Sequence, residues 1–173
     1  MNHSFQLRKL ELPDLIALQR ISVQTFIEAF AHQNTSENMR LYLEQSFSLE
    51  KLAKEITNPH SSFYGISNAE ELIAYCKLNV ENAQSESLAP NTVEMERLYV
   101  LKSQQGKGWG KCLIEHALYI AHQKSSPFIW LGVWEKNESA IGFYKKLGFR
   151  EFGRHVFMLG QDEQTDSLMR LDL

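Results

Sequence analysis

Hydrophobic positions along the chain follow two different periods. Short apolar runs and two-residue alternation predict strands, whereas apolar residues three and four positions apart predict helices. The predicted strands cover 5–10, 62–67, 72–80, 93–101 and 128–134, with two more around Val156 and Leu168. The predicted helices run from Pro13 to Phe30, from Ser36 past Leu43, from Ser48 to Ile56, from Gly110 to Gln123 and from Asn137 to Leu147. Residues 81–90 are polar and are expected to form a mobile loop, and without repeats or linkers we expect one α+β domain over 1–173.

Composition restricts the class of protein. Of the 173 residues, 43% are hydrophobic and 23% are charged, which is typical of a globular protein. The net charge of −3 argues against nucleic acid as a partner, because nucleic-acid-binding proteins usually carry a basic face, and it slightly favours a cationic substrate. An apolar run of about 20 residues and a signal segment are both missing, so no membrane partner is expected. With only Cys76 and Cys112, the expected location is the reducing cytoplasm.

The segment from Leu98 to Lys111 is the most informative part of the chain. An apolar strand leads into glycines at 106, 108 and 110 and then directly into an amphipathic helix. Glycine lets backbone N–H groups approach a ligand and tolerates a positive φ angle. The N-terminus of a helix adds unpaired N–H donors and a partial positive charge. This junction is therefore predicted to bind the diphosphate of a cofactor.

Two common phosphate-binding motifs do not fit this segment. A Walker loop needs a serine or threonine after its lysine, but Cys112 follows Lys111. A dinucleotide fingerprint has a different glycine spacing and an acidic residue on the next strand, which this chain lacks. The pattern Gln105-x-x-Gly108-x-Gly110 instead resembles the pyrophosphate loop of the GCN5-related N-acetyltransferases (GNAT), which bind acetyl-coenzyme A.

A second motif covers residues 137–149. Asn137 suits a helix N-cap, and Gly148 is placed for a left-handed C-cap. Tyr144 shares a helix face with Ala140 and Ile141, so its ring is expected to pack while its hydroxyl finds a polar partner. Asn-x-x-Ala-x-x-Phe-Tyr-x-x-x-Gly-Phe resembles the second hallmark of the same family. With both hallmarks in order, the chain is identified as a member of the GNAT superfamily.

The resemblance implies a fold, a cosubstrate and an acceptor. It implies a mixed, mostly antiparallel sheet of about seven strands flanked by helices, with a splay between the two central strands. Acetyl-CoA is the implied cosubstrate; the scattered histidines predict no metal. Segments from about Thr25 onward, Gln164-Thr165-Asp166 among them, resemble the bacterial PaiA-type spermine/spermidine acetyltransferases, which implies a polyamine acceptor. Homodimers are common in the superfamily, so a homodimer is a further expectation.

Two acidic residues are candidates for the general base. An ammonium group must lose a proton before it attacks a thioester, and a nearby carboxylate can accept it. Glu94 and Glu96 stand two apart on the predicted strand, hence on one face. Glu96 lies four residues before Val100, at the position that resembles the base of the family, and Glu94 is the second candidate. The alternative is that one or both acids face solvent or pair with Arg97 or Arg154.

The resemblance also assigns residues to the coenzyme and the leaving group. The backbone at residues 98–100 is expected to pair with the pantetheine arm and to polarise the thioester carbonyl. Tyr144 matches the general acid that protonates the departing thiolate, and Lys146 is the lysine best placed for a phosphate. Transfer is expected to be direct, because neither cysteine matches a nucleophile position. The expected coenzyme-binding residues are Leu98, Tyr99, Val100, Gln105, Gly106, Lys107, Gly108, Trp109, Gly110, Lys111, Asn137 and Lys146.

The acceptor site and two rival functions complete the expectations. The segment Phe26–Tyr42 is expected to complete the acceptor pocket, with Glu28, Glu37 and Glu44 as candidates for binding a polycation. One rival is a coenzyme A sensor without turnover, which would need neither Glu96 nor Tyr144. The other rival is an acetyltransferase for another small amine or for a peptide amine, and a peptide substrate would want an open groove.

Overall fold

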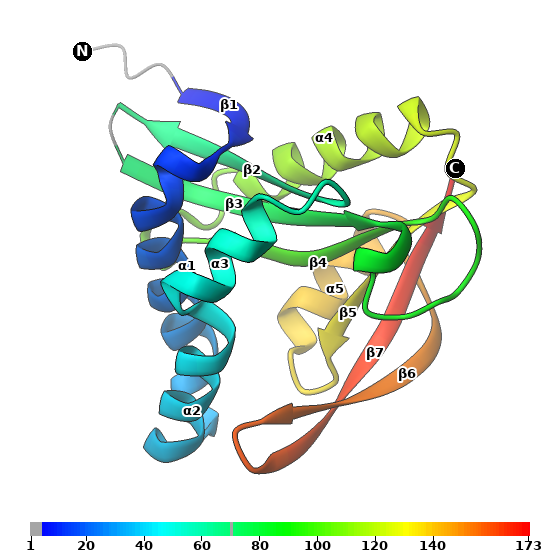
Figure 1. Cartoon of the computed structure of the whole chain (residues 1–173). Helices are drawn as coiled ribbons and strands as arrows, with labels where there is room; N and C mark the ends of the chain where they lie inside the picture. The colour runs from blue at the N-terminus through cyan, green and yellow to red at the C-terminus, as the bar shows by residue number, and fades with distance from the viewer. Residues whose placement is uncertain (1–4, 70) are drawn as a thin grey trace.

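The computed structural model describes residues 5–69 and 71–173, in which seven strands form one sheet of order β1-β2-β3-β4-β5-β7-β6 (Figure 1). The strands are β1 (Phe5–Leu10), β2 (Ser61–Asn68), β3 (Glu71–Val80), β4 (Val93–Val100), β5 (Phe128–Trp134), β6 (Arg150–Leu159) and β7 (Asp162–Asp172). All neighbouring strands run antiparallel except β4 and β5, which are parallel. The predicted seven-stranded, mostly antiparallel mixed sheet is confirmed.

The two parallel strands stay together at one end only. Val93 pairs with Ile129 and Glu94 pairs with Trp130, and beyond these residues β4 and β5 separate. On its other side, β4 remains paired with β3 as far as Val100. The edge of β4 that faces β5 therefore has no strand partner after Glu94 among the described residues. The splay is confirmed, and it leaves backbone N–H and C=O groups free to pair with an extended ligand.

Helices cover both faces of the sheet. On one face, α1 (Leu15–Phe30) packs on β3 and β4, α3 (Leu49–Ile56) packs on β2, and α2 (Ser36–Phe47) reaches β6 (Figure 1). On the other face, α4 (Trp109–Gln123) packs against β2 to β5. The short helix α5 (Glu138–Lys146) lies beside α4, since a Cβ on Gly110 would lie 3.4 Å from the Phe143 ring. Four single 3₁₀ turns complete the chain: η1 (Leu12–Asp14), η2 (Ala31–Gln33), η3 (Glu81–Ala83) and η4 (Lys102–Gln104).

Local signals in the sequence explain where the helices begin and end. The Ser48 hydroxyl accepts from the N–H of Lys51 and caps α3, as predicted. The cap of α2 is Thr35 rather than Ser36, because Thr35 has the extended backbone that a cap requires and its hydroxyl accepts from the N–H of Asn38. Gly148, with a φ of +92°, ends α5 at the predicted position.

The segment after β3 is tied down more firmly than the prediction of a mobile loop over 81–90 implied. The Gln84 Oε1 accepts from the Thr92 hydroxyl at 3.0 Å and from the Trp130 indole N–H at 2.8 Å. The Glu86 carboxylate lies 2.7 Å from Nδ1 of His155 on β6. These contacts join the segment to β5, to β6 and to the residue just before β4, which periodicity along the chain could not indicate.

Candidate active site

A cavity of about 280 Å³ lies where β4 and β5 separate. Phe26, Phe30 and Tyr42 contribute to its wall, so the helical segment predicted to complete the acceptor pocket does line it. The rings of Phe26 and Tyr42 stack with their centroids 4.4 Å apart. Strands β4 to β7 and helix α5 supply the rest of the lining, including most of its polar groups. The cavity therefore combines aromatic walls with a few charged side chains, as small-molecule sites usually do.

A β-bulge in β4 brings four polar side chains to this cavity. Lys77 pairs with Arg97 and Leu78 pairs with Met95, so Glu96 has no counterpart on β3. One extra residue in a strand reverses the alternation of faces beyond it. Glu94 and Glu96 line the cavity before the bulge, and Arg97 and Tyr99 line it after the bulge. With regular alternation along β4, the side chains of Arg97 and Tyr99 would point to the opposite face of the sheet.

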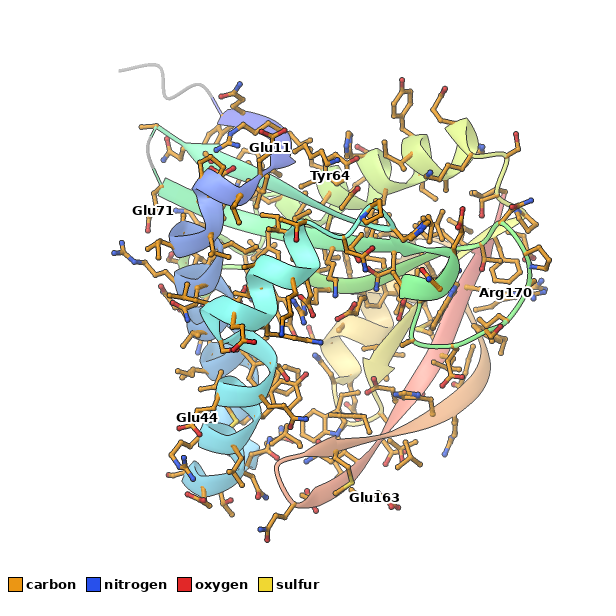
Figure 2. All side chains as sticks on the ribbon, viewed as in Figure 1. Glu11, Glu44, Tyr64, Glu71, Glu163 and Arg170 are labelled. Carbon is orange, nitrogen blue, oxygen red and sulfur yellow. The ribbon has the colours of Figure 1, made fainter. Side chains whose placement is uncertain are left out.

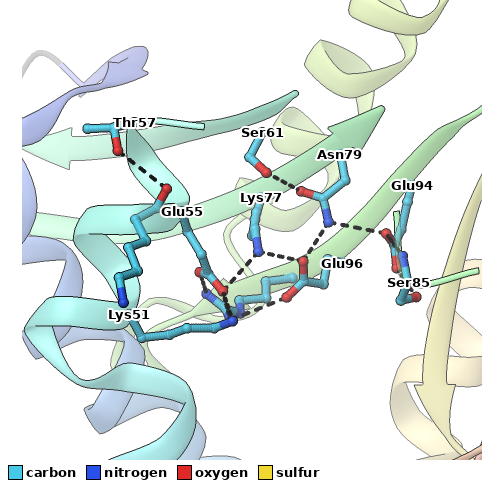
Figure 3. A network of polar contacts seen from close by, with 11 residues as sticks. Lys51, Glu55, Thr57, Ser61, Lys77, Asn79, Ser85, Glu94 and Glu96 are labelled. Carbon is cyan, nitrogen blue, oxygen red and sulfur yellow. Dashed lines mark hydrogen bonds and ion pairs between the residues drawn. The ribbon is translucent and has the colours of Figure 1, made fainter. Parts of the chain in front are cut away.

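Glu94 is a buried carboxylate held by neutral donors. It is 2% exposed, and it accepts from the backbone N–H of Ser85 at 2.8 Å, from the Ser85 hydroxyl and from Nδ2 of Asn79 at 3.1 Å (Figure 3). Burial raises the pKa of Glu94, and the charge of Glu96 adds to the rise, against the hydrogen bonds from Ser85. A carboxylate with a raised pKa on a cavity wall suits a general base near neutral pH.

Glu96 lies within a network of opposite charges. Its carboxylate is 2.6 Å from the Lys77 ammonium and 3.3 Å from the Arg97 guanidinium, and it accepts from Asn79. Both cations also pair with Glu55 of α3, at 3.1 Å and 2.7 Å (Figure 3). Burial alone would raise the pKa of Glu96, but Arg97 and Lys77 outweigh it and the pKa is lowered. Glu96 is thus a partner for buried cations and a weak proton acceptor.

Tyr144 is presented to the cavity by a defined helix end. The N–H of Phe149 donates to the Tyr144 carbonyl at 3.1 Å and the N–H of Gly148 donates to the Lys145 carbonyl at 3.0 Å, which is the Schellman pattern. The Tyr144 and Phe149 rings meet with centroids 5.7 Å apart. Tyr144 is 8% exposed, and burial raises the pKa of its phenol, so the hydroxyl stays protonated at neutral pH. It therefore meets the cavity as a hydrogen-bond donor.

The glycine loop has the donors that an anion requires. Gly106 and Gly108 have φ angles of +75° and +88°, and no atom lies within 4 Å of the position of a Cβ on either. The N–H groups of Gly106, Lys107 and Gly108 have no acceptor among the described residues. The first N–H groups of α4, which begins at Trp109, add to them. The loop is therefore an open anion-binding turn at a helix N-terminus.

The remaining predicted coenzyme residues fall into two groups. Leu98, Tyr99 and Val100 lie on the unpaired edge of β4, and the Gln105 amide donates to the Val100 carbonyl at 3.2 Å. Asn137 lines the cavity while its side chain caps α5 by accepting from the N–H of Ala140. These residues lie between the glycine loop and the cavity.

The other group points elsewhere. The Lys107 ammonium donates to Gln104, and Lys111 lies 3.7 Å from Glu115 on the exposed side of α4. The Trp109 ring packs on Phe5, with centroids 4.2 Å apart. Lys146 is exposed at the end of α5. Of these residues, only the backbone of 107, 109 and 111 belongs to the anion-binding turn.

The acidic residues expected to bind a polycation lie outside the cavity lining. Glu37 and Glu44 both pair with Arg40 on the exposed side of α2, at 2.8 Å each, and Glu44 points away from the sheet (Figure 2). Glu28 accepts from the backbone N–H of Lys102. Local charge neutralisation on the helix surface explains the positions of Glu37 and Glu44, and the cavity lining includes none of the three acids.

Asp166 is the acid of the cavity that the sequence analysis did not select. It lies on β7 opposite Trp134 of β5 and opposite His155 of β6, and all three residues line the cavity. Burial raises the pKa of Asp166 to about 6, and nearby His155 opposes the rise. Only the pairing of β7 with β5 and β6 brings it here, so nothing local in the sequence marked it. Within the described ranges, no three His, Cys, Asp or Glu side chains gather as metal ligands.

Known proteins resemble this chain in sequence and in fold. The model of the acetyltransferase (GNAT) family matches residues 21–149. The chain is 42% identical to an uncharacterized N-acetyltransferase in the pepI 3' region of Lactobacillus delbrueckii subsp. lactis. That alignment of 165 residues covers 95% of this chain and 94% of the relative. The chain is 27% identical to the spermidine N(1)-acetyltransferase of Thermoplasma acidophilum, over 85% of this chain and 89% of that protein.

A solved structure shares the whole architecture. The crystal structure of PaiA N-acetyltransferase from Thermoplasma acidophilum in complex with coenzyme A superposes with a TM-score of 0.80 at 25% identity. The superposition covers 98% of this chain and 99% of that one. Among the residues described here, no helix is long and apolar enough to cross a membrane.

Proposed function

The chain belongs to the acetyltransferase (GNAT) family, and we propose that it transfers acetyl from acetyl-CoA directly to a primary amine, with a polyamine such as spermidine or spermine as the acceptor. The observation that carries this proposal is that Glu94 and Tyr144 line one cavity at the splay of β4 and β5. A proton acceptor and a proton donor there are what acyl transfer to an amine requires.

Two features of the backbone support the proposed position of the coenzyme. The open N–H groups at 106–108 and at the start of α4 suit the diphosphate, and the unpaired edge of β4 at 98–100 suits the amides of the pantetheine arm. This path leads the thioester into the splay, beside Tyr144. The similar fold of the PaiA protein in complex with coenzyme A supports this placement.

The chemistry needs three proton transfers and one acyl transfer. The Glu94 carboxylate takes a proton from the ammonium group of the acceptor, and the free amine attacks the thioester carbonyl carbon. The tetrahedral oxyanion collapses as the C–S bond breaks, and the nitrogen releases its second proton to solvent. The Tyr144 hydroxyl gives its proton to the departing thiolate, which leaves as the thiol, and a proton from solvent restores the hydroxyl. Glu94 returns its proton to solvent before the next turnover. Cys76 takes no part, because burial raises the pKa of its thiol to about 12.

The charge of the cavity supports a cationic acceptor. Glu94, Glu96 and Asp166 line the cavity, whereas Arg97 is its one lining cation among the described residues and is already paired with Glu55 and Glu96. Aromatic rings such as Trp130 and Trp134 complete walls that suit ammonium groups. The spermidine acetyltransferase of Thermoplasma acidophilum, a relative at 27% identity, agrees with this choice.

A thiol-release assay tests the proposal. Purified protein is incubated with acetyl-CoA and, separately, with spermidine, spermine, amino acids, aminoglycosides and a lysine peptide. We expect the highest kcat/KM with a polyamine, and Glu94→Gln as the inactive control. Release with the lysine peptide alone would point to a peptide acetyltransferase. Coenzyme binding without release from any amine would point to a regulatory protein and would refute the proposal.

A further inference from the structure

Asp166 is an acidic group of the cavity, and the histidine paired with it across the strands, His155, lies against Glu86 instead. The Asp166 carboxylate forms no hydrogen bond and no ion pair with another residue in the part of the chain that the structure describes. The other two acids of the cavity are held by donors, Glu94 by Ser85 and Asn79, and Glu96 by Lys77 and Arg97. A partly buried carboxylate without a partner costs free energy that a cationic ligand would offset.

The surroundings of Asp166 suit an ammonium group. In the antiparallel pairing of β5 and β7, Asp166 is directly opposite Trp134, so the carboxylate and the indole lie on one face of the sheet. The Phe30 ring meets the Trp134 ring at 5.6 Å between centroids. The Lys136 ammonium already lies 5.7 Å from the Trp134 ring centre, so this indole attracts cations.

A glycine in β5 makes room for the Asp166 carboxylate. A Cβ on Gly132 would lie 3.0 Å from Oδ2 of Asp166, closer than such contacts normally come. Gly132 also lines the cavity. In the interior of a strand, glycine weakens the strand and often marks the close approach of another group. Here that group is the carboxylate, which lies across β5 at the cavity wall.

Asp166 and Glu94 are separated along the sheet. Glu94 is paired with Trp130, and Asp166 with Trp134, four residues further along β5. Four residues of a strand span roughly 13 Å. Both carboxylates line one cavity, so a flexible chain with a cationic nitrogen at each end can reach both.

We propose that Asp166 binds a second ammonium group of the acceptor, so that the cavity selects amines with two or more cationic nitrogens over monoamines of the same length. Asp166 is thus a specificity-determining residue, and Glu94 acts on the nitrogen that is acetylated. This inference rests on the proposed transfer of acetyl to an amine.

Matched amines test the selection. The kcat/KM values of wild type and Asp166→Asn are measured with spermidine, with 1,8-diaminooctane, whose nitrogens are as many chain atoms apart as the outer nitrogens of spermidine, and with octylamine, which lacks the second nitrogen. We expect Asp166→Asn to lower kcat/KM for 1,8-diaminooctane and spermidine by about 10- to 100-fold and to change the octylamine value by less than about 3-fold. Asp162→Asn is the control, because it removes an exposed charge from the same strand outside the cavity lining.

The outcomes separate this proposal from the proposed function. Equal losses for octylamine and 1,8-diaminooctane, or no loss for either, would overturn the role of Asp166 while acetyl transfer stands. If wild type acetylates no amine, the proposed function fails. The role of Asp166 is then tested by the binding of spermidine alone, measured as a shift in Tm. Spermidine should raise the Tm of wild type and of Asp162→Asn but not of Asp166→Asn; equal Tm shifts in all three would overturn the inference.

Discussion

Glu94 and Glu96 share one donor: the Nδ2 of Asn79 lies 3.1 Å from the first carboxylate and 2.5 Å from the second. Their pKa values nevertheless move in opposite directions. Burial raises the pKa of Glu94, which has only neutral donors around it. The pKa of Glu96 is lowered, because Arg97 and Lys77 outweigh the effect of burial. Two acids on one strand face thus have different chemistry, and the difference comes from the cations beside Glu96, Arg97 of β4 and Lys77 of β3.

The two acids should respond differently to the same change. Glu94→Gln is expected to lower kcat by about 10²- to 10⁴-fold, the usual contribution of a general base, with little change in the free energy of unfolding. Glu96→Gln leaves Lys77 and Arg97 with Glu55 as their remaining charged partner, so it is expected to destabilise the fold by on the order of 1–3 kcal/mol. Initial-rate assays measure kcat, and urea unfolding measures the free energy of unfolding. If folded Glu96→Gln loses more kcat than Glu94→Gln does, Glu96 is the general base and Glu94 is not.

The pH dependence of turnover should follow Glu94. A base must be unprotonated to act, so kcat is expected to rise with pH through the raised pKa of Glu94 and then to level. In Glu94→Gln this rise should be absent from the residual rate. The measurement is kcat between about pH 5 and 9 with saturating amine. An identical pH profile of kcat in wild type and Glu94→Gln would mean that the rise with pH comes from another group.

Tyr144→Phe tests the donor to the leaving thiolate. The variant keeps the ring that packs on Phe149 and loses only the hydroxyl. We expect kcat to fall by roughly 10- to 100-fold while the Kd of coenzyme A, measured by calorimetry, stays within about 2-fold. An unchanged kcat would remove Tyr144 from the reaction. The change in kcat should be small in Tyr119→Phe, the control on an exposed face of α4.

Two substitutions of Gly108 separate strain from charge. Both Gly108→Ala and Gly108→Glu place a side chain on a residue with a φ of +88°, so both incur the strain of a left-handed backbone. Only glutamate adds a negative charge beside the predicted diphosphate site. Calorimetry with coenzyme A should show no binding to Gly108→Glu and weakened binding to Gly108→Ala. Equal affinities of the two variants for coenzyme A would contradict the assignment of this loop to the diphosphate.

Asp166 should lower the stability of the unliganded protein above its own pKa. Burial raises the pKa from 3.8 to about 6, so the folded state holds this proton more tightly than the unfolded state does. The stability contributed by the protonated group is therefore present below the unfolded value and is lost as pH rises through about 6.

Asp166→Asn stays neutral throughout this range. Urea unfolding should therefore find the variant more stable than wild type by on the order of 1–3 kcal/mol near pH 8, with a smaller difference near pH 5. Asp162→Asn, with its charge exposed, should show no such dependence on pH. A variant that is less stable than wild type at both pH values would mean that Asp166 has a partner in solution.

Local patterns in the sequence anticipated most of the secondary structure. Alternation along 5–10 and the helical spacing after Pro13 reflect interactions within one element, and so does the cap at Ser48. Thr35 took the place of Ser36 because two adjacent hydroxyl residues fit the same cap signal. The bulge at Glu96 escaped prediction, since it depends on the register between β3 and β4.

The sequence by itself determined the anion-binding turn and the helix that presents Tyr144. Glycines with positive φ and the capping residues Asn137 and Gly148 act on their own backbone, so their effect is written in neighbouring positions. Only the tertiary structure decided which acids face the acceptor. Strand pairing turned Asp166 into the cavity, and the register of β3 against β4 placed the cations Lys77 and Arg97 beside Glu96, because pairing between strands brings together residues that are far apart in the chain.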